Sequence, residues 1–109
     1  MRLTSEIWIA AYRRRLELAG IPAFVVRRGD ASAGAVLVKL ATLDGRAAIY
    51  QRSVDLVTGG RKWMTLAEGS EAEVDAAVAR QAGRDPDLWV IEIEDRQGRH
   101  LLDEDGLSE

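Results

Sequence analysis

The sequence contains no cysteine and a single histidine, His100, in 109 residues. The absence of cysteine excludes disulfide bonds, thiolate nucleophiles and the usual structural zinc sites, and it is compatible with a reducing compartment. A lone histidine excludes a histidine pair for zinc or copper, and its spacing marks no Ser-His dyad. We therefore expect no metal, no cofactor and no set of catalytic residues.

Long hydrophobic runs are also missing. The longest ones, such as residues 35–38, cover a handful of positions, whereas a membrane-spanning helix needs about 20. No continuous apolar segment precedes the three arginines at 13–15, so the N-terminus does not have the pattern of a signal peptide. We expect a cytoplasmic protein that does not enter a membrane.

Charge is distributed unevenly along the chain. Residues 1–62 contain eleven Lys or Arg against five Asp or Glu, whereas residues 63–109 contain four against thirteen. The net charge of −3 therefore combines a half of +6 with a half of −9. Such a separation either acts across the surface, where it steers charged partners, or is neutralised inside the fold, and the sequence leaves both possibilities open.

Length and composition predict one soluble domain over residues 1–109. The hydrophobic fraction is 47% and the charged fraction is 30%, which is the balance of an ordinary globular protein. Residues 103–109 form an acidic tail that we expect to fray.

The first third of the chain predicts a helix followed by a strand. Thr4 or Ser5 can cap a helix that runs to about Ala19, with an apolar stripe at helical spacing, and Gly20 ends it. Residues 23–28 then form a short β-rich run.

Two β-hairpins are predicted next. Residues 35–42 and 46–52 flank Asp44 and Gly45, which favour a two-residue turn with positive φ at both positions. That turn would set Leu40 opposite Ile49. Residues 54–58 and 61–66 form the second predicted hairpin, with Trp63 as its core anchor.

A second helix and a last pair of strands complete the prediction. Ser70 and Glu73 form a capping box for a helix that runs to Ala82, and Gly83 is its expected stop. Residues 88–95 alternate as a half-buried strand, and residues 100–102 form a final short one. The order is α-β-β-β-β-β-α-β, which predicts an α+β fold with a mostly antiparallel sheet of about five strands and two helices on one face.

Several segments together resemble a small bacterial family known as domain of unknown function 1491. The segments that carry the resemblance are Arg2-Leu3-Thr4-Ser5-Glu6, Gly20-Ile21-Pro22-Ala23, Val26-Arg27-Arg28-Gly29-Asp30, Gly34-Ala35-Val36-Leu37-Val38-Lys39 and Arg99-His100-Leu101-Leu102-Asp103. The resemblance covers nearly the whole chain. It implies no activity, ligand or catalytic residue.

Three carboxylates on one predicted strand are the candidates for metal chemistry. Glu92, Glu94 and Asp95 can set two carboxylates about 7 Å apart on one face, which would suit a metal-dependent enzyme. Binary patterning alone also produces such a strand face, solvated and paired with Lys39 or Arg52 of a neighbouring strand, and we favour that interpretation.

Basic residues are the candidates for binding. Arg27 and Arg28 stand beside the small-residue loop 29–34, where guanidinium and backbone N–H groups can hold an anion. We expect a noncatalytic interaction module that binds an acidic protein partner, or self-associates, through a basic face. Its candidate residues are Arg13, Arg14, Arg27, Arg28, Asp30, Lys39 and Arg52. Nucleic-acid or phosphate-ligand binding is the alternative, although a pI near 5.2 opposes a nucleic-acid surface.

Overall fold

The computed structural model describes residues 3–54 and 56–108, and helix α1 (Ser5–Leu18) is the first element of this part. Thr4 is its N-cap, because the Thr4 hydroxyl accepts a hydrogen bond from the Ile7 N–H at 3.3 Å. Gly20, with φ at +74°, follows the end of the helix. The capped first helix is thus confirmed. Its buried apolar side consists of Trp8, Ile9, Tyr12 and Leu16.

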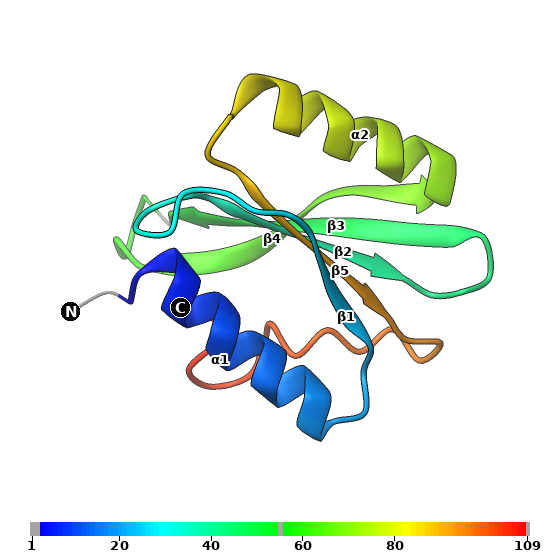
Figure 1. The fold of residues 1–109 in the computed structure, drawn as a ribbon, viewed down its shortest axis with the longest axis horizontal. Helices are drawn as coiled ribbons and strands as arrows, with labels where there is room; N and C mark the ends of the chain where they lie inside the picture. The colour runs from blue at the N-terminus through cyan, green and yellow to red at the C-terminus, as the bar shows by residue number, and fades with distance from the viewer. Residues whose placement is uncertain (1–2, 55, 109) are drawn as a thin grey trace.

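The described strands form one mixed sheet in the order β1-β5-β2-β3-β4 (Figure 1). Their bounds are β1 Ala23–Arg27, β2 Val36–Ala41, β3 Arg46–Val54, β4 Arg61–Ser70 and β5 Trp89–Glu94. Neighbouring strands are antiparallel except for β2 and β5, which are parallel. The predicted α+β fold with a mostly antiparallel sheet is confirmed.

The second helix, α2 (Glu71–Arg84), begins at the predicted capping residue. The Ser70 hydroxyl accepts a hydrogen bond from the Glu73 N–H at 3.2 Å and donates one to the Glu73 carboxylate at 3.1 Å. The helix continues through Gly83, so the prediction that Gly83 ends it is wrong. Asp85 is its C-cap.

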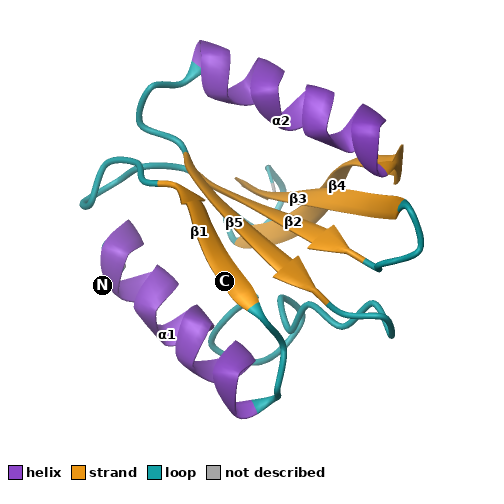
Figure 2. Cartoon of the chain, turned by 45° about the vertical axis from the view of Figure 1, so that its right-hand side comes forward, coloured by secondary structure: helices purple, strands orange, loops and turns teal. Residues whose placement is uncertain are grey.

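The two helices cover opposite faces of the sheet (Figure 2), so the expectation that both lie on one face is wrong. Val36, Val38 and Leu40 of β2 pack with α1. The intervening Leu37 faces the other way and packs against Val78 of α2. Because β2 is apolar at consecutive positions, both of its faces have to be covered.

The predicted strand at 54–58 is not formed as a separate element. Val54 is the last residue of β3, and residues 56–58 lie in the turn that leads to β4. Residue 55 lies outside the described residues. The hairpin of β3 and β4 is therefore longer than predicted, and four strands rather than five stand between the helices.

The hairpin of β2 and β3 has a three-residue loop rather than a two-residue turn. Thr42 N–H donates to the Arg46 carbonyl, and φ is positive at Leu43 and Gly45 rather than at Asp44. Every cross-strand pair is consequently shifted by one residue from the predicted register, so Leu40 lies opposite Ala48.

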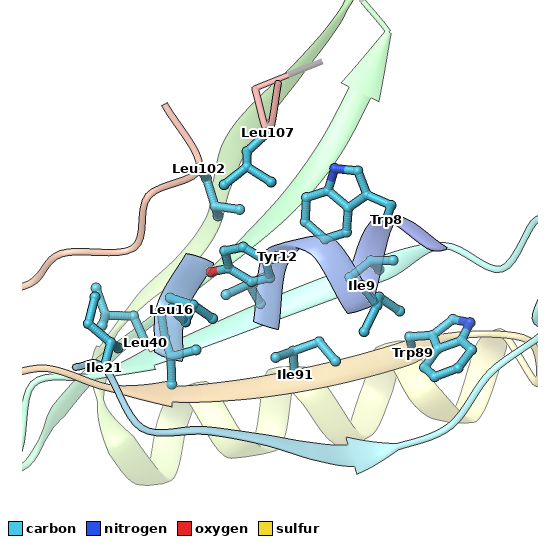
Figure 3. Packing of buried hydrophobic residues seen from close by; sticks show 13 residues of the cluster. Trp8, Ile9, Tyr12, Leu16, Ile21, Leu40, Trp89, Ile91, Leu102 and Leu107 are labelled. Atoms are coloured by element: carbon cyan, nitrogen blue, oxygen red, sulfur yellow. The ribbon is translucent and has the colours of Figure 1, made fainter. Parts of the chain in front are cut away.

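Residues 96–108 form no strand and pack against α1 instead (Figure 3). Leu102 and Leu107 are both buried beside Trp8 and Tyr12. The Trp63 indole N–H also donates to the Leu107 carbonyl at 3.0 Å, and Trp63 packs against this core as predicted. Leu107 is therefore anchored in this core, whereas residues 103–106 of the acidic tail, for which we predict fraying, are exposed.

The same substitution at two glycines tests the turn. At Gly45, φ is +86° and no atom lies within 4 Å of the position that a Cβ would take, so Gly45→Ala should lower the free energy of unfolding by about 1 kcal/mol through backbone strain alone. Gly83 lies in α2 without positive φ and in equally open space, so Gly83→Ala should raise it by about 0.5 kcal/mol. Urea unfolding measures both, and equal effects of the same sign would contradict the turn geometry.

Candidate functional site

Lys39 lies in the middle of β2 and is 5% exposed. Its Nζ lies 2.6 Å from Asp75 Oδ1, 2.6 Å from Glu92 Oε1 and 3.0 Å from Glu71 Oε1. Glu92 is its register partner on the parallel strand β5. Glu71 and Asp75 come from the first residues of α2, one turn apart. We call these four residues the lysine cluster.

The lysine cluster holds a permanent cation rather than a nucleophile. Burial alone would lower the pKa of Lys39, but hydrogen bonds to Asp75, Glu92 and Glu71 outweigh it and raise the pKa above its ordinary value. A lysine that stays protonated at neutral pH has no lone pair with which to attack a carbonyl group. The cluster therefore ties α2 to the sheet, and the predicted pairing of a strand carboxylate with Lys39 is confirmed for Glu92.

Asp95, which was predicted on the strand, follows the end of β5 and is 9% exposed. Its Oδ2 accepts hydrogen bonds from Arg99 N at 2.7 Å and Nε at 3.1 Å, and its Oδ1 accepts one from Nη2 at 3.0 Å. These bonds hold the pKa of Asp95 below its ordinary value. Glu94 stands partly exposed beside it. Over residues 3–54 and 56–108, no group of three or more His, Cys, Asp or Glu is arranged to hold a metal.

His100 has a structural position. Its Nδ1 accepts a hydrogen bond from the Leu102 N–H at 2.9 Å, and its carbonyl accepts one from the Tyr12 hydroxyl at 2.9 Å. Its ring lies 4.7 Å from the ring of Tyr50. Burial raises the pKa of Tyr12, which keeps that hydroxyl a donor. His100 thus joins the C-terminal segment to α1.

Two of the predicted binding arginines make contacts within the fold. Arg27 Nη1 donates to the Leu88 carbonyl at 2.6 Å and to the Asp85 carbonyl at 3.3 Å. The Arg28 guanidinium lies 5.0 Å from the ring centroid of Trp89. Both side chains therefore support the connection between α2 and β5.

Loop 29–34 packs tightly and supports the start of α1. Asp30 Oδ2 accepts a hydrogen bond from the Ala33 N–H at 2.9 Å. A side chain at Gly29 or Gly34 would overlap the Asp87 carbonyl. The loop carbonyls also accept from the first N–H groups of α1, so these donors are already satisfied. Its place in the fold is that of a connecting loop.

Arg13 and Arg14 lie exposed on α1. Arg14 Nη1 is 3.3 Å from Glu17 Oε2, with both side chains more than 60% exposed, so this pair adds little stability. The nearby Arg15 is bound to the C-terminal segment, where it donates to the Asp105 carbonyl at 2.7 Å.

Arg52 and Arg61 line a surface hollow of about 370 Å³ between the start of α1, residues 32–36 and strands β3 and β4. Hydroxyl-bearing residues share this lining, including Thr4, Ser32 and Ser53. The described lining contains no Asp or Glu. We call this feature the arginine hollow.

Aromatic rings hold Arg52 at the arginine hollow. Its guanidinium carbon lies 5.3 Å from the ring centroid of Trp8 and 5.5 Å from that of Trp63. Trp63 is the register partner of Arg52 on β4, and Arg61 lies two residues from Trp63 on the same strand face. The fold therefore places both arginines on the lining of one hollow, and two indole rings lie beside the guanidinium of Arg52.

The seven residues predicted for a basic face do not lie together. Lys39 faces α2, Arg27 and Arg28 support a loop, and Arg13 and Arg14 lie on the outer side of α1. Of the predicted set, Arg52 alone lines the arginine hollow. Sequence reasoning missed Arg61 as its neighbour. The alternation of Arg61 with the core residue Trp63 is the signal that points Arg61 to the face of α1.

Neither described helix is long and apolar enough to cross a bilayer.

Over residues 3–103 the chain matches the family described as a protein of unknown function, DUF1491. It is similar to a DUF1491 family protein from Caulobacter crescentus CB15, whose crystal structure is 46% identical with a TM-score of 0.82 and covers 95% of this chain and 96% of that chain. An NMR structure of a DUF1491 family protein from the same organism is 47% identical with a TM-score of 0.82, covering 94% of each chain. The solution structure of protein Atu0922 from A. tumefaciens is 34% identical with a TM-score of 0.73, covering 86% of each chain. The comparison with curated proteins gives no match.

Removal of the ammonium tests the lysine cluster. Lys39→Met leaves three carboxylates close together without a cation, so we expect the free energy of unfolding to fall by roughly 2–4 kcal/mol. The loss stays below the full cost of breaking a buried pair, because Glu71 and Asp75 are about half exposed. Urea unfolding measures it. Lys62→Met is the matched control at the chain's other lysine, which is exposed and should change stability by less than about 0.5 kcal/mol. Equal losses in the two variants would show that the cluster does not secure α2.

Amine labelling provides a second test, because the chain has two lysines of opposite environment. At pH 8 in the native protein, Lys62 should react and Lys39 should remain unmodified, since its ammonium is enclosed by three carboxylates. Both should react in urea. Peptide mass spectrometry distinguishes the two sites. Native labelling of Lys39 at the rate of Lys62 would contradict the enclosed cation.

Proposed function

The chain belongs to the DUF1491 family, whose description states no activity, and we propose from its site that it is a noncatalytic module that binds acidic side chains of a protein partner in the arginine hollow. The observation that carries the proposal is that Arg52 and Arg61 line one hollow together with hydroxyl-bearing residues. Guanidinium groups bind carboxylates through paired hydrogen bonds, and nearby hydroxyl groups add further donors.

The position of Arg52 between aromatic rings favours ligand binding. Two indole rings lie within 5.5 Å of its guanidinium, so the side chain loses little further freedom when it binds a ligand. Arg61, on the neighbouring strand, is partly exposed and available to the same ligand.

The distribution of the other charges favours a short acidic segment over a nucleic acid. A nucleic-acid surface needs several cations along one face to neutralise successive phosphates. Here Lys39 is enclosed on the opposite face, and the acidic C-terminal segment packs against α1, where Arg15 lies 3.8 Å from Glu104. A partner that presents one or two carboxylates suits the arginine hollow better than a polyanion.

A phosphate-bearing ligand is the second candidate, because guanidinium groups and hydroxyl groups also suit phosphate oxygens. We do not extend the proposal to a metal-dependent enzyme with Glu92, Glu94 and Asp95, since Glu92 and Asp95 are already bound to Lys39 and Arg99. We place the module in the cytoplasm, which the cysteine-free sequence favours.

Tryptophan fluorescence can report binding directly, because Arg52 lies over two indole rings. Titration with a hexaglutamate peptide should change the emission, and Arg61→Ser should weaken binding by about tenfold and flatten its salt dependence, because one of two cations is lost. Arg80→Ser, on the exposed side of α2, is the matched control and should bind like the wild type.

Inorganic phosphate serves as the competing probe in the same titration. Saturable binding of phosphate that depends on Arg61, without binding of the peptide, would favour the phosphate-bearing ligand instead. Peptide affinity that is equal in the wild type and in Arg61→Ser would overturn the arginine hollow as a binding site.

A further inference from the structure

The outer side of α1 carries apolar residues that the described part of the chain leaves uncovered. Ile7 is 54% exposed and Leu18 is 70% exposed, and the exposed residues Ala10, Ala11 and Arg14 lie between them. Ile7, Ala11 and Arg14 are spaced by four and three residues, and Leu18 follows four residues later, which keeps them on one stripe. We call these five residues the outer stripe. The helix is therefore apolar on two sides, whereas a surface helix is ordinarily polar on the outside.

We propose that the outer stripe binds the outer stripe of a second copy of the chain, with the two helices antiparallel about a two-fold axis. An axis at the middle of the stripe sets Ala10 of one copy opposite Ala11 of the other. The same register sets Ile7 opposite the aliphatic part of Arg14, and Leu18 opposite Leu3, which is 56% exposed. Small residues at the centre allow the helices to approach closely.

The charges beside the outer stripe identify the partner and its direction. Glu6 and Arg13 lie seven residues apart on the same flank of α1, and both are exposed. In the antiparallel pair, Glu6 of each copy approaches Arg13 of the other, so two opposite-charge contacts form by symmetry. A parallel pair would set Glu6 and Arg13 against the partner's Ala11 and the partner's Leu18, so neither charge would meet an opposite one. Within its own chain, Glu6 already lies 3.4 Å from Arg28 at an exposed site, so Arg13 of the second copy would share this carboxylate with Arg28.

A shallow hollow next to the outer stripe suits the same register. It has a volume of about 520 Å³ and is lined by residues that include Ala10, Arg14 and Ile21. The antiparallel register brings Leu3 and Ile7 of the second copy towards it, and their apolar side chains can fill it. A single helix pair lies near the lower limit of specific interfaces, about 1,000–1,200 Å² in total, so we expect a dimer whose population depends on protein concentration.

A single introduced cysteine tests the register, because the natural chain has none. Ala11→Cys lies beside the two-fold axis, so oxidation should form a covalent dimer at least about tenfold faster than in Leu56→Cys. Leu56 is the matched control, since it is 97% exposed in the turn between β3 and β4. Equal rates of cross-linking in the two variants would overturn the proposed interface.

Sedimentation velocity over a range of concentrations tests the charges. The wild type should pass from a monomer of 12.0 kDa to a dimer. Arg13→Glu should weaken the dimer by about tenfold, and the double variant with Glu6→Arg should restore it, because the swapped charges attract again. A dimer restored in the double variant would also show that this variant is folded. A wild type that stays monomeric at millimolar concentration, or a double variant as weak as the single one, would overturn the proposal.

The dimer and the arginine hollow are separate proposals that share Leu3, and variants at other residues distinguish them. Ala11 and Arg13 do not line the arginine hollow, so these variants should bind the hexaglutamate peptide like the wild type. Conversely, Arg61→Ser should leave the concentration dependence of sedimentation unchanged, and a dimer lost in that variant would show that association runs through the hollow rather than through α1.

Discussion

Burial of β2 on both faces is the constraint on which the rest of the structure depends. All six residues of this strand are buried, so α1 has to cover one face and α2 the other. Lys39 is the charged residue in this strand, and an unpaired ammonium there would cost several kcal/mol. The start of α2 meets this demand with Glu71 and Asp75, and β5 adds Glu92. The helix is thereby fixed by charge at its first turn and by apolar packing further along.

The separation of charge along the sequence is resolved partly inside the molecule and partly at its surface. Lys39, from the basic half, is enclosed by carboxylates of the acidic half, and Arg15 binds the acidic C-terminal segment. Arg27 also comes from the basic half, but its guanidinium donates to the Leu88 backbone carbonyl rather than to a carboxylate of the acidic half. Part of the basic half is therefore engaged within the fold, and on this ground we propose a small acidic ligand rather than a polyanion.

Helix α1 connects the two proposed binding surfaces. Its inner side carries Trp8, which packs with Trp63 and holds Arg52 at the arginine hollow. Its outer side carries the apolar stripe that we assign to a second copy. Both surfaces therefore depend on the position of one helix, and that position is set by the sheet and by the buried C-terminal residues Leu102 and Leu107. Of the two residues predicted to bind an acidic partner through this helix, Arg14 belongs to the outer stripe and Arg13 lies beside it.

Features that depend on neighbouring residues were determined by the sequence itself. Thr4 and Ser70 cap the two helices because their hydroxyl groups reach N–H groups three residues away, and alternation in β5 sets Trp89, Ile91 and Ile93 on one buried face. Tertiary structure decided the features that depend on strand order and register. One extra loop residue at Leu43 shifts a whole ladder, and the parallel pairing of β5 with β2 sets Glu92 against Lys39. Three further features follow from contacts between residues that are distant in sequence, and local patterns contain no information about such contacts. These features are the shared hollow of Arg61 and Arg52, the carboxylates of α2 around Lys39 and the burial of Leu107.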